Sequence, residues 1–463
     1  MSTSKLDLFE KVSVLKAIIK LAVPTVICQI ILVIYNMADT FFIGMTGNDE
    51  MLTAVTVCMP AFMFLSAVAN LFGVGGSCVI SRALGKKDLN RASSASVFSF
   101  WGCFFTTLLY SLLAWTFSDL FIDLLGGGDL TVHAYAKQYL LITVIIGGEF
   151  TAMNALLAHL IRAEGRSLHA SAGVVLGGIL NIILDPIFMF MLFEPGYETL
   201  GAAVATTLSN AIALGYYVIV LIKNGQNSVL SFKPSKEALM HGIPGDILST
   251  GLPACLMTLF ENISYAILDN LMSGFGTICQ AGLGVAKKIN MLAHCIVRGI
   301  SQSVLPLIAY NYSNRNYQRT KKAITCTAVL SVSMASLCML ASLLFSKPLV
   351  GVFIQSGSES LRYGARFLRI LCIGAPFSAC AYTFISFFQA TGESRKSFLL
   401  AILRKGIIDI PLMFLLNRVL PYYGIVSATP IADVLCCIVA VIMYSAYTIR
   451  FTSRENTFSA MAQ

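Results

Sequence analysis

Long apolar stretches separated by short polar connections account for most of this chain. A helix needs about 20 apolar residues to cross the roughly 30 Å hydrocarbon layer of a membrane. Twelve stretches reach that length, at residues 18–43, 51–78, 93–118, 136–160, 168–192, 201–222, 246–271, 278–309, 323–346, 364–389, 397–417 and 424–448. The pattern therefore predicts an all-α integral membrane protein with twelve transmembrane helices.

The chain also repeats itself. Pro24, Asp39, Arg91, Gly165, Asp185 and Gly201 recur, in the same order, as Pro253, Asp269, Arg319, Gly392, Asp409 and Gly424. The flanking residues support the match, since GAAVATTLSN from Gly201 aligns with GIVSATPIAD from Gly424. An even number of helices per repeat makes the two repeats parallel, and such duplication is typical of secondary transporters. We expect an N-terminal six-helix lobe at 1–222, a cytoplasmic linker at 223–245 and a C-terminal six-helix lobe at 246–463.

Composition and charge agree with a membrane protein. Hydrophobic residues make up 57% and charged residues 12% of the chain, whereas soluble proteins average about 45–50% and about 25%. Lys and Arg concentrate in alternate connections, so the positive-inside rule predicts that both termini lie in the cytoplasm. This asymmetry also accounts for the net charge of +9, and it gives no reason to expect a nucleic acid as a partner.

The sequence contains no phosphate-binding loop, nucleotide motif, His-rich metal set or nucleophile motif. These absences disfavour an ATP-driven pump and a membrane enzyme, and they give no indication of a bound cofactor. Transport would then draw its energy from an ion gradient. Ionisable residues within membrane spans are rare and mark functional sites by default.

The N-terminal half carries three such acids, Asp39, Glu149 and Asp185. Asn181 lies four residues before Asp185, so both side chains occupy one face of a helix. Thr206 adds a hydroxyl in the next apolar stretch. Carboxylate, amide and hydroxyl oxygens can hold a proton or a small monovalent cation such as Na⁺, which makes Asp39, Asn181, Asp185 and Thr206 the candidate coupling site.

The C-terminal half offers a second polar set. Glu261 and Asp269 lie eight residues apart in the stretch 246–271, on one helical face, and Lys288 and Asp409 could form ion pairs there. Together with Glu149 they are candidates for substrate binding or for a second coupling site. For Lys288 a lysine that extends to the membrane interface is an equally good interpretation.

Three prolines fall inside predicted spans close to these polar residues. Pro24 and Pro186 should interrupt their helices and free backbone carbonyls, and a kinked segment should begin after Pro253. All three are candidate hinges.

Several motifs together resemble the multidrug and toxic compound extrusion (MATE) family, in its MepA-like, damage-inducible subgroup. They are RAEGRS at 162–167, NIILDP at 181–186, GAAVAT at 201–206 and GISQSVLPLIAYNYSNRNYQR at 299–319. The resemblance implies a V-shaped, two-lobed and monomeric transporter in a bacterial cytoplasmic membrane. It also implies export of small organic cations in exchange for Na⁺ or H⁺.

The resemblance assigns roles to individual residues as well. It implies that Asp39, Asn181, Asp185 and Thr206 form the cation site of the N-terminal lobe. Glu261 matches a glutamate of the sodium-coupled branch, but Cys380 stands where that branch has an aspartate.

A flippase for lipid-linked precursors has the same architecture and is the alternative function, and the bare topology would also fit a channel. Flippases usually need a cationic cavity for pyrophosphate, whereas the deep charges identified here are mostly acidic. Coulomb attraction therefore favours a cationic cargo.

Overall fold

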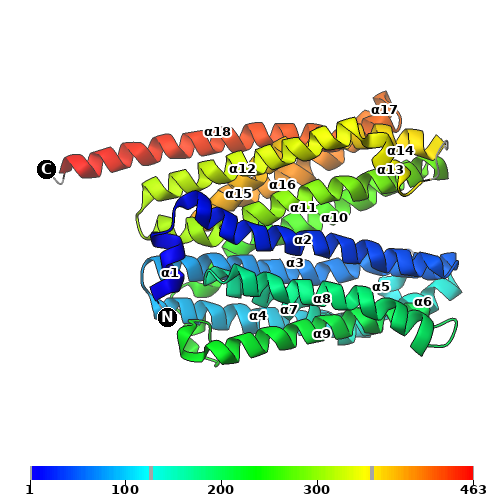
Figure 1. Ribbon diagram of the computed structural model, residues 1–463, viewed down its shortest axis with the longest axis horizontal. Helices are drawn as coiled ribbons and strands as arrows, with labels where there is room; N and C mark the ends of the chain where they lie inside the picture. Colours follow the sequence, from blue (N-terminus) through cyan, green and yellow to red (C-terminus); the bar gives the residue numbers. More distant parts are fainter. Residues whose placement is uncertain (1–2, 125–128, 355–358, 462–463) are drawn as a thin grey trace. The chain divides into compact units, whose positions relative to one another are not determined.

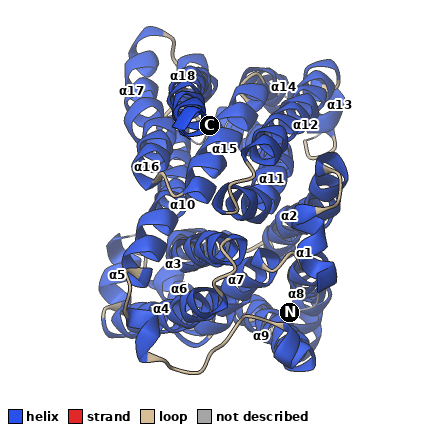
Figure 2. Cartoon of the chain, turned by 90° about the vertical axis from the view of Figure 1, so that its left-hand side faces the viewer, coloured by secondary structure: helices blue, strands red, loops and turns tan. Residues whose placement is uncertain are grey.

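The computed structural model describes residues 3–124, 129–354 and 359–461. These residues form helices joined by turns and loops, with no strand among them (Figure 2). The first part of the chain contains α1 (Thr3–Glu10), α2 (Val14–Met45), α3 (Asp49–Gly85), α4 (Leu89–Thr116), α5 (Ser118–Leu124), α6 (Leu130–Leu140), η1 (Leu141–Ile146), α7 (Gly148–Ala163), α8 (Ser167–Ile187), η2 (Phe188–Leu192), α9 (Glu198–Asn224), η3 (Gly225–Asn227) and η4 (Lys236–Leu239). The second part contains α10 (Ile243–Ser273), α11 (Thr277–Ser313), α12 (Tyr317–Leu344), α13 (Ser346–Gly351), α14 (Glu359–Cys372), α15 (Ala375–Thr391), α16 (Ser394–Ile402), η5 (Leu403–Asp409), α17 (Ile410–Val419) and α18 (Tyr423–Met461).

Many of these helices are long and apolar enough to span a membrane. Of the helices described, nine pass that test alone, and the number rises to eleven when each of two bent pairs counts as one span. The bends are 47° between Leu130–Ile146 and Gly148–Ala163, and 41° between Glu359–Cys372 and Ala375–Thr391. The prediction of an all-helical membrane protein is confirmed.

The one predicted span that fails this test, at 397–417, is built from α16, η5 and α17 (Figure 1). Its middle carries Arg404, Lys405 and Asp409, all of them buried. Charges at the centre of the stretch explain why it is less apolar than the other spans.

The chain divides into two compact units. Unit 1 contains Met1–Asn262, Gln302–Ala323 and Ala390–Gly392, and unit 2 contains Ile263–Ser301, Ile324–Gln389 and Glu393–Gln463. Helices α10, α11 and α12 contribute residues to both. The boundaries of the two lobes, taken from the sequence repeat, stay a prediction.

Short polar side chains set where several helices begin. Asn48 accepts hydrogen bonds from the N–H groups of Glu50 and Met51, at 2.9 and 3.2 Å, at the start of α3. Asp129 caps α6 in the same way. Such caps satisfy N–H groups that have no partner inside the helix.

One turn is built identically in the two halves of the sequence. Lys87 and Arg315 have φ angles of +60° and +57°, in the left-handed region. In the next position, Asp88 accepts from the N–H three residues later at 2.9 Å, and Asn316 does so at 3.1 Å. The sequence repeat is thus a repeat of local backbone structure as well.

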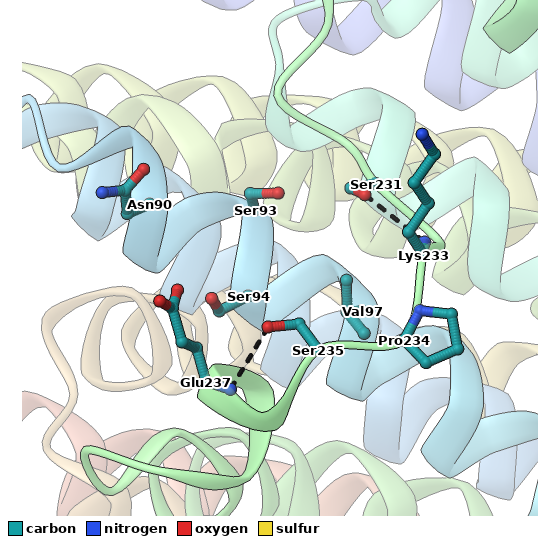
Figure 3. A pocket seen from close by; sticks show the side chains of 9 residues that line it. All are labelled: Asn90, Ser93, Ser94, Val97, Ser231, Lys233, Pro234, Ser235 and Glu237. Atoms are coloured by element: carbon teal, nitrogen blue, oxygen red, sulfur yellow. Dashed lines mark hydrogen bonds between the residues drawn. The ribbon is translucent and has the colours of Figure 1, made fainter.

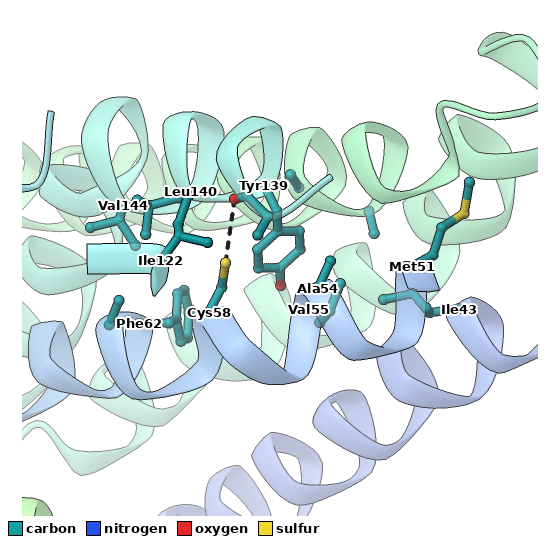
Figure 4. Close-up of a cluster of buried hydrophobic side chains, with 14 of the residues drawn as sticks. Ile43, Met51, Ala54, Val55, Cys58, Phe62, Ile122, Tyr139, Leu140 and Val144 are labelled. Atoms are coloured by element: carbon teal, nitrogen blue, oxygen red, sulfur yellow. Dashed lines mark hydrogen bonds between the residues drawn. The ribbon is translucent and has the colours of Figure 1, made fainter. Parts of the chain in front are cut away.

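In unit 1, α3 packs against α4, α6 and α7, while α8 packs against α2 and α9. A buried apolar cluster joins α3 to α6 and includes Val55, Phe62 and Tyr139 (Figure 4). Within it the thiol of Cys58 donates to the carbonyl of Ala136 at 3.3 Å. This core fixes the helices that surround the polar residues of α2 and α8.

In unit 2, α18 packs against α14, α16, α17 and η5. Its core contains Leu268, Phe367, Met413 and Ile425, which are fully buried. Element η5 is a π-helix, a wider turn often found at functional sites.

The predicted hinge prolines behave differently from one another. Helix α2 continues through Pro24, so the expected interruption is wrong there. Helix α10 likewise continues through Pro253, after which the sequence predicts a kinked segment. In contrast, α8 ends one residue after Pro186 and passes into the π-helix η2. Hinge motion at any of them stays a prediction.

Candidate cation site

Helices α2 and α8 lie unusually close together in unit 1. A Cβ atom at Gly178 of α8 would lie 2.9 Å from Cγ2 of Ile31 and 3.5 Å from the ring of Tyr35, both on α2. Glycine therefore permits the approach. One turn beyond this point, α2 carries Asp39 and α8 carries Asn181.

Three predicted site residues are joined by hydrogen bonds. The amide nitrogen of Asn181 donates to Oδ1 of Asp185 and to the hydroxyl of Thr206, both at 3.1 Å. Asp185 is fully buried, and Asn181 and Thr206 are almost so. The i, i+4 spacing on α8 and the packing of α8 against α9 bring these groups together.

Asp39 is also buried, with 6% of its surface exposed. Its carboxylate and that of Asp185 are near enough for their charges to interact, and Tyr35 and Tyr139 lie within range of both acids. Among the residues that the structure describes, neither acid forms an ion pair with Lys or Arg.

Oxygen atoms without a partner make this cluster a candidate binding site. Oδ1 of Asp39, Oδ2 of Asp185 and Oδ1 of Asn181 are buried, and none has a hydrogen-bond donor in the described parts of the chain. Buried polar atoms are rarely left unpaired. A proton or a small hard cation would satisfy these oxygens, since Na⁺ prefers carboxylate, amide and hydroxyl ligands.

The same cluster does not suit a transition metal. Within the described ranges, no three His, Cys, Asp or Glu side chains converge on one point. Sites for softer or more highly charged metals usually need such a set.

A second layer of amides supports the cluster. Asn154 of α7 donates to Oδ1 of Asn210 at 2.9 Å, and Asn210 donates to the carbonyl of Thr206 at 3.0 Å. Sequence reasoning missed Asn154. Its signal was an amide inside an otherwise apolar stretch of α7, where a polar group needs a buried partner.

Two further predicted acids lie elsewhere in unit 1. Glu149 follows the bend before α7, and both its carboxylate oxygens are buried without a partner in the parts of the chain described. Glu261 lies on α10 and is partly buried. No hydrogen bond described here joins either residue to Asp185.

The predicted polar residues of unit 2 form ion pairs instead. Asp269 pairs with Lys287, whereas Lys288 is exposed. Asp409 accepts hydrogen bonds from Lys405 at 2.9 Å, from Ser264 at 2.7 Å and from Thr429 at 3.1 Å.

Sequence reasoning also missed two buried cations in unit 2. Besides Lys405, Arg404 is buried and pairs with Asp433 at 2.8 Å. The signal was two basic residues in the apolar stretch 397–417, one of them four residues before an aspartate.

A shallow polar hollow of about 220 Å³ lies at the start of α4, beneath the segment before η4 (Figure 3). Its walls include Ser93, Ser94, Lys233 and Glu237. None of the predicted site residues lines it.

Comparisons with known proteins place the chain in a family. The multidrug export protein MepA of Staphylococcus aureus (strain MRSA252) is 29% identical over 448 residues, which cover 96% of each chain. The crystal structure of MATE in complex with MaL6 superimposes with a TM-score of 0.89 at 25% identity, covering 98% of this chain and 100% of that one.

A second solved structure supports the fold alone. It is the outward-facing conformation of a multidrug resistance MATE family transporter of the MOP superfamily, with a TM-score of 0.88 at 24% identity over 98% of this chain and 100% of the other. The family model MatE matches twice, at residues 24–187 and 253–415. This chain therefore belongs to the MatE family of membrane transporters.

Proposed function

We propose that this protein exports small organic cations across a bacterial cytoplasmic membrane in exchange for Na⁺ or H⁺. The observation that carries the proposal is the pair Asp39 and Asp185 in unit 1, buried close to each other without a basic partner among the described residues. Asn181 and Thr206 complete the set of oxygen donors.

The energetics of a buried carboxylate explain how such a pair could couple transport. An acid at the centre of a membrane span costs about 2.5–3.5 kcal/mol, and two adjacent acids repel each other when both are charged. Binding a proton or Na⁺ removes much of this cost. The site would thus alternate between a loaded and an empty state of different stability, which is what an ion-driven transporter requires.

Relatives and charge support the choice of substrate. The staphylococcal relatives are named multidrug export proteins. Glu149 of unit 1 adds a buried carboxylate that would attract cations. Aromatic and Met side chains, which are abundant here, can accept varied flat cations through cation–π contacts and repacking.

A lipid flippase is less well supported. Such a protein needs uncompensated positive charge to bind pyrophosphate. The buried cations Arg404 and Lys405 of unit 2 are each paired with an aspartate, Asp433 and Asp409. These pairs leave little net positive charge for an anionic lipid.

The orientation follows from the basic connections. Lys86 and Lys87 lie in the turn between α3 and α4, while Arg315 lies between α11 and α12, and such residues favour the cytoplasm. Both termini would then be cytoplasmic. An antibody against a C-terminal tag should bind only after cells are permeabilised, whereas binding to intact cells would reverse the orientation. A monomeric state stays a prediction.

Transport in a defined membrane tests the function directly. Purified protein in vesicles loaded with a fluorescent monovalent cation should release the dye when an inward Na⁺ or H⁺ gradient is imposed. ATP should have no effect. Dye release that requires ATP, or that ignores both gradients, would rule out the proposed antiport.

A further inference from the structure

The acids that the sequence repeat relates to the cation site of unit 1 are already neutralised within unit 2. Asp39 and Asp185 correspond to Asp269 and Asp409. Asp269 pairs with Lys287 and Asp409 pairs with Lys405. Their counterparts in unit 1 have no ion pair among the described residues.

The two clusters correspond residue by residue. The offset of 224 that relates Asp185 to Asp409 also relates Asn181 to Lys405. The aligned segments from Gly201 and Gly424 likewise place Thr206 opposite Thr429. In each unit the acid therefore has a polar residue four positions earlier on its helix and a threonine from the following long helix.

Hydrogen bonding in the second cluster differs at one point. In unit 1 the amide of Asn181 donates to Asp185 and leaves Oδ2 of the acid unpaired. In unit 2 both oxygens of Asp409 are used, Oδ2 by Lys405 and Ser264 and Oδ1 by Thr429. The lysine thus supplies a positive charge to its acid from the position at which Asn181 supplies only a neutral amide in unit 1.

Each of the two clusters also has a tyrosine at the corresponding position. Tyr35 lies within electrostatic range of Asp39 and Asp185 in unit 1. The offset that relates Asp39 to Asp269 relates Tyr35 to Tyr265. The ammonium groups of Lys287 and Lys405 lie over the ring of Tyr265, each 5.4 Å from its centroid. Cations are attracted to such a ring face.

We propose that unit 2 contains a second monovalent-cation site, homologous to the proposed site of unit 1, in which the ammonium of Lys405 permanently takes the place of the ion. The inference rests on the proposed function, because it interprets Asp409 by analogy with Asp185. A tethered cation cannot exchange with solution. Only unit 1 would then bind an exchangeable ion, and unit 2 would keep one charge state throughout the transport cycle.

Lys405, rather than Lys287, is the lysine that takes the place of the ion, because its ion pair is the more deeply buried. The side chains of Lys405 and Asp409 are 4% and 0% exposed, whereas that of Asp269 is 45% exposed. Water can replace the partner of an exposed acid, but an acid left alone in the interior needs another cation. Lys405→Asn, which copies Asn181, should therefore open the site to Na⁺.

The test measures ²²Na⁺ binding to the purified full-length protein at pH 8. All variants carry Asp185→Asn, which removes the proposed site of unit 1 from the measurement. Adding Lys405→Asn should create saturable Na⁺ binding with one ion per chain. Adding Asp409→Asn to that variant should abolish the binding, and Lys287→Asn in place of Lys405→Asn should create none.

Folding is followed by gel filtration and thermal unfolding in Na⁺ and in choline. Na⁺ should raise the Tm of Asp185→Asn/Lys405→Asn and leave that of the Asp409→Asn triple variant unchanged. The proposal is overturned if the double variant is folded but binds no Na⁺. It is also overturned if the triple variant folds while the double variant fails to fold even in high Na⁺.

The same measurements distinguish a failure of the proposed function from a failure of the tethered cation in unit 2. If the wild type and Asp185→Asn bind equally little Na⁺, sodium coupling in unit 1 fails. Na⁺ binding gained through Lys405→Asn would still support the tethered cation in unit 2.

Discussion

Asp185 is costly to bury and is the central residue of the proposed cation site. It is fully buried and accepts a hydrogen bond from the amide of Asn181. Its other carboxylate oxygen has no partner among the described residues. An amide at this position would be cheaper to bury than a charge. The presence of an acid is therefore better explained by a cation that binds and leaves than by the stability of the helix.

Replacing either acid by its amide tests this explanation. Asp39→Asn and Asp185→Asn should insert and fold, because the shape is nearly unchanged and less charge is buried. Ion-driven dye efflux should fall at least about tenfold, which corresponds to an increase of about 1.4 kcal/mol in the free-energy barrier to transport.

Asp119→Asn is the matched control. Asp119 is exposed and paired with Lys137 at 2.6 Å, and the hydrogen bond from this lysine lowers the pKa of Asp119 below its ordinary value. The control should transport normally. Wild-type efflux in both Asp39→Asn and Asp185→Asn, at equal membrane abundance, would return these acids to a purely structural role.

Helix periodicity made the positions of some polar residues predictable from the sequence, but not those of others. The spacing of Asn181 and Asp185 follows from helix periodicity, so their shared face could be inferred from the sequence. Lys405 obeys the same spacing relative to Asp409. However, a basic residue in an apolar stretch reveals neither its depth nor its partner, because both depend on how neighbouring helices pack.

At the scale of helices, close backbone contacts set the position of the polar groups. Gly201, near the start of α9, faces the π-helix η2 that follows α8. A Cβ at this position would lie 2.9 Å from backbone atoms of Phe188 and Met189. Five residues further along α9, Thr206 reaches Asn181. The glycine therefore controls how closely Thr206 approaches the acid on α8.

Gly201→Ala should push α9 away from η2. We expect a cost of about 1–3 kcal/mol, as in other overpacked sites, seen as a lower Tm together with weaker ion-driven efflux. Gly215→Ala, on the same helix, is the control because nothing lies within 4 Å of its added Cβ. If both variants unfold and transport alike, α9 is not positioned in this way.

A buried acid helps to hold the connection after α9. Glu164 is fully buried and accepts hydrogen bonds from the hydroxyl of Ser228 and the N–H of Val229, both at 2.7 Å. It also pairs with Arg166 at 3.4 Å. The RAEGRS motif thus ties the segment between the two repeats to unit 1.

Glu164→Ala should release this segment. It removes one partner of a buried ion pair, a change that typically costs about 3–5 kcal/mol. Limited trypsin digestion should then cut faster after Lys236, whereas Lys233 is followed by Pro234 and resists trypsin. Asn227→Ala, at an exposed position of the same segment, should leave the cleavage rate unchanged. Equal rates in the wild type and Glu164→Ala would show that the segment is anchored elsewhere.

Helix existence was easier to predict than helix shape. Apolar length located the spans, whereas the capping roles of Asn48 and Asp88 became clear only from the structure. The bend beside Gly147 and the π-helix η5 carry no comparable signal. Both depend on backbone hydrogen bonds that shift by one residue, and such shifts are decided by tertiary packing.

At the scale of the whole molecule, duplication has preserved structure more closely than charge. The family model matches both halves of the sequence, and the turns at Lys87 and Arg315 have the same backbone conformation. The buried acids nevertheless differ, since Asp185 of unit 1 lacks a basic partner in the described chain and Asp409 of unit 2 has Lys405. We infer that the two halves share a fold and that only unit 1 binds the exchangeable ion.

The measurement that tests this account most directly reverses the driving force. Vesicles containing the purified protein receive a gradient of an organic cation and no ion gradient, and the movement of Na⁺ and H⁺ is recorded. Antiport through the site of unit 1 requires that one of these ions moves opposite to the organic cation, and that the countermovement disappears in Asp185→Asn. Organic cation that crosses without any counterflow, or counterflow that persists in Asp185→Asn, would contradict it.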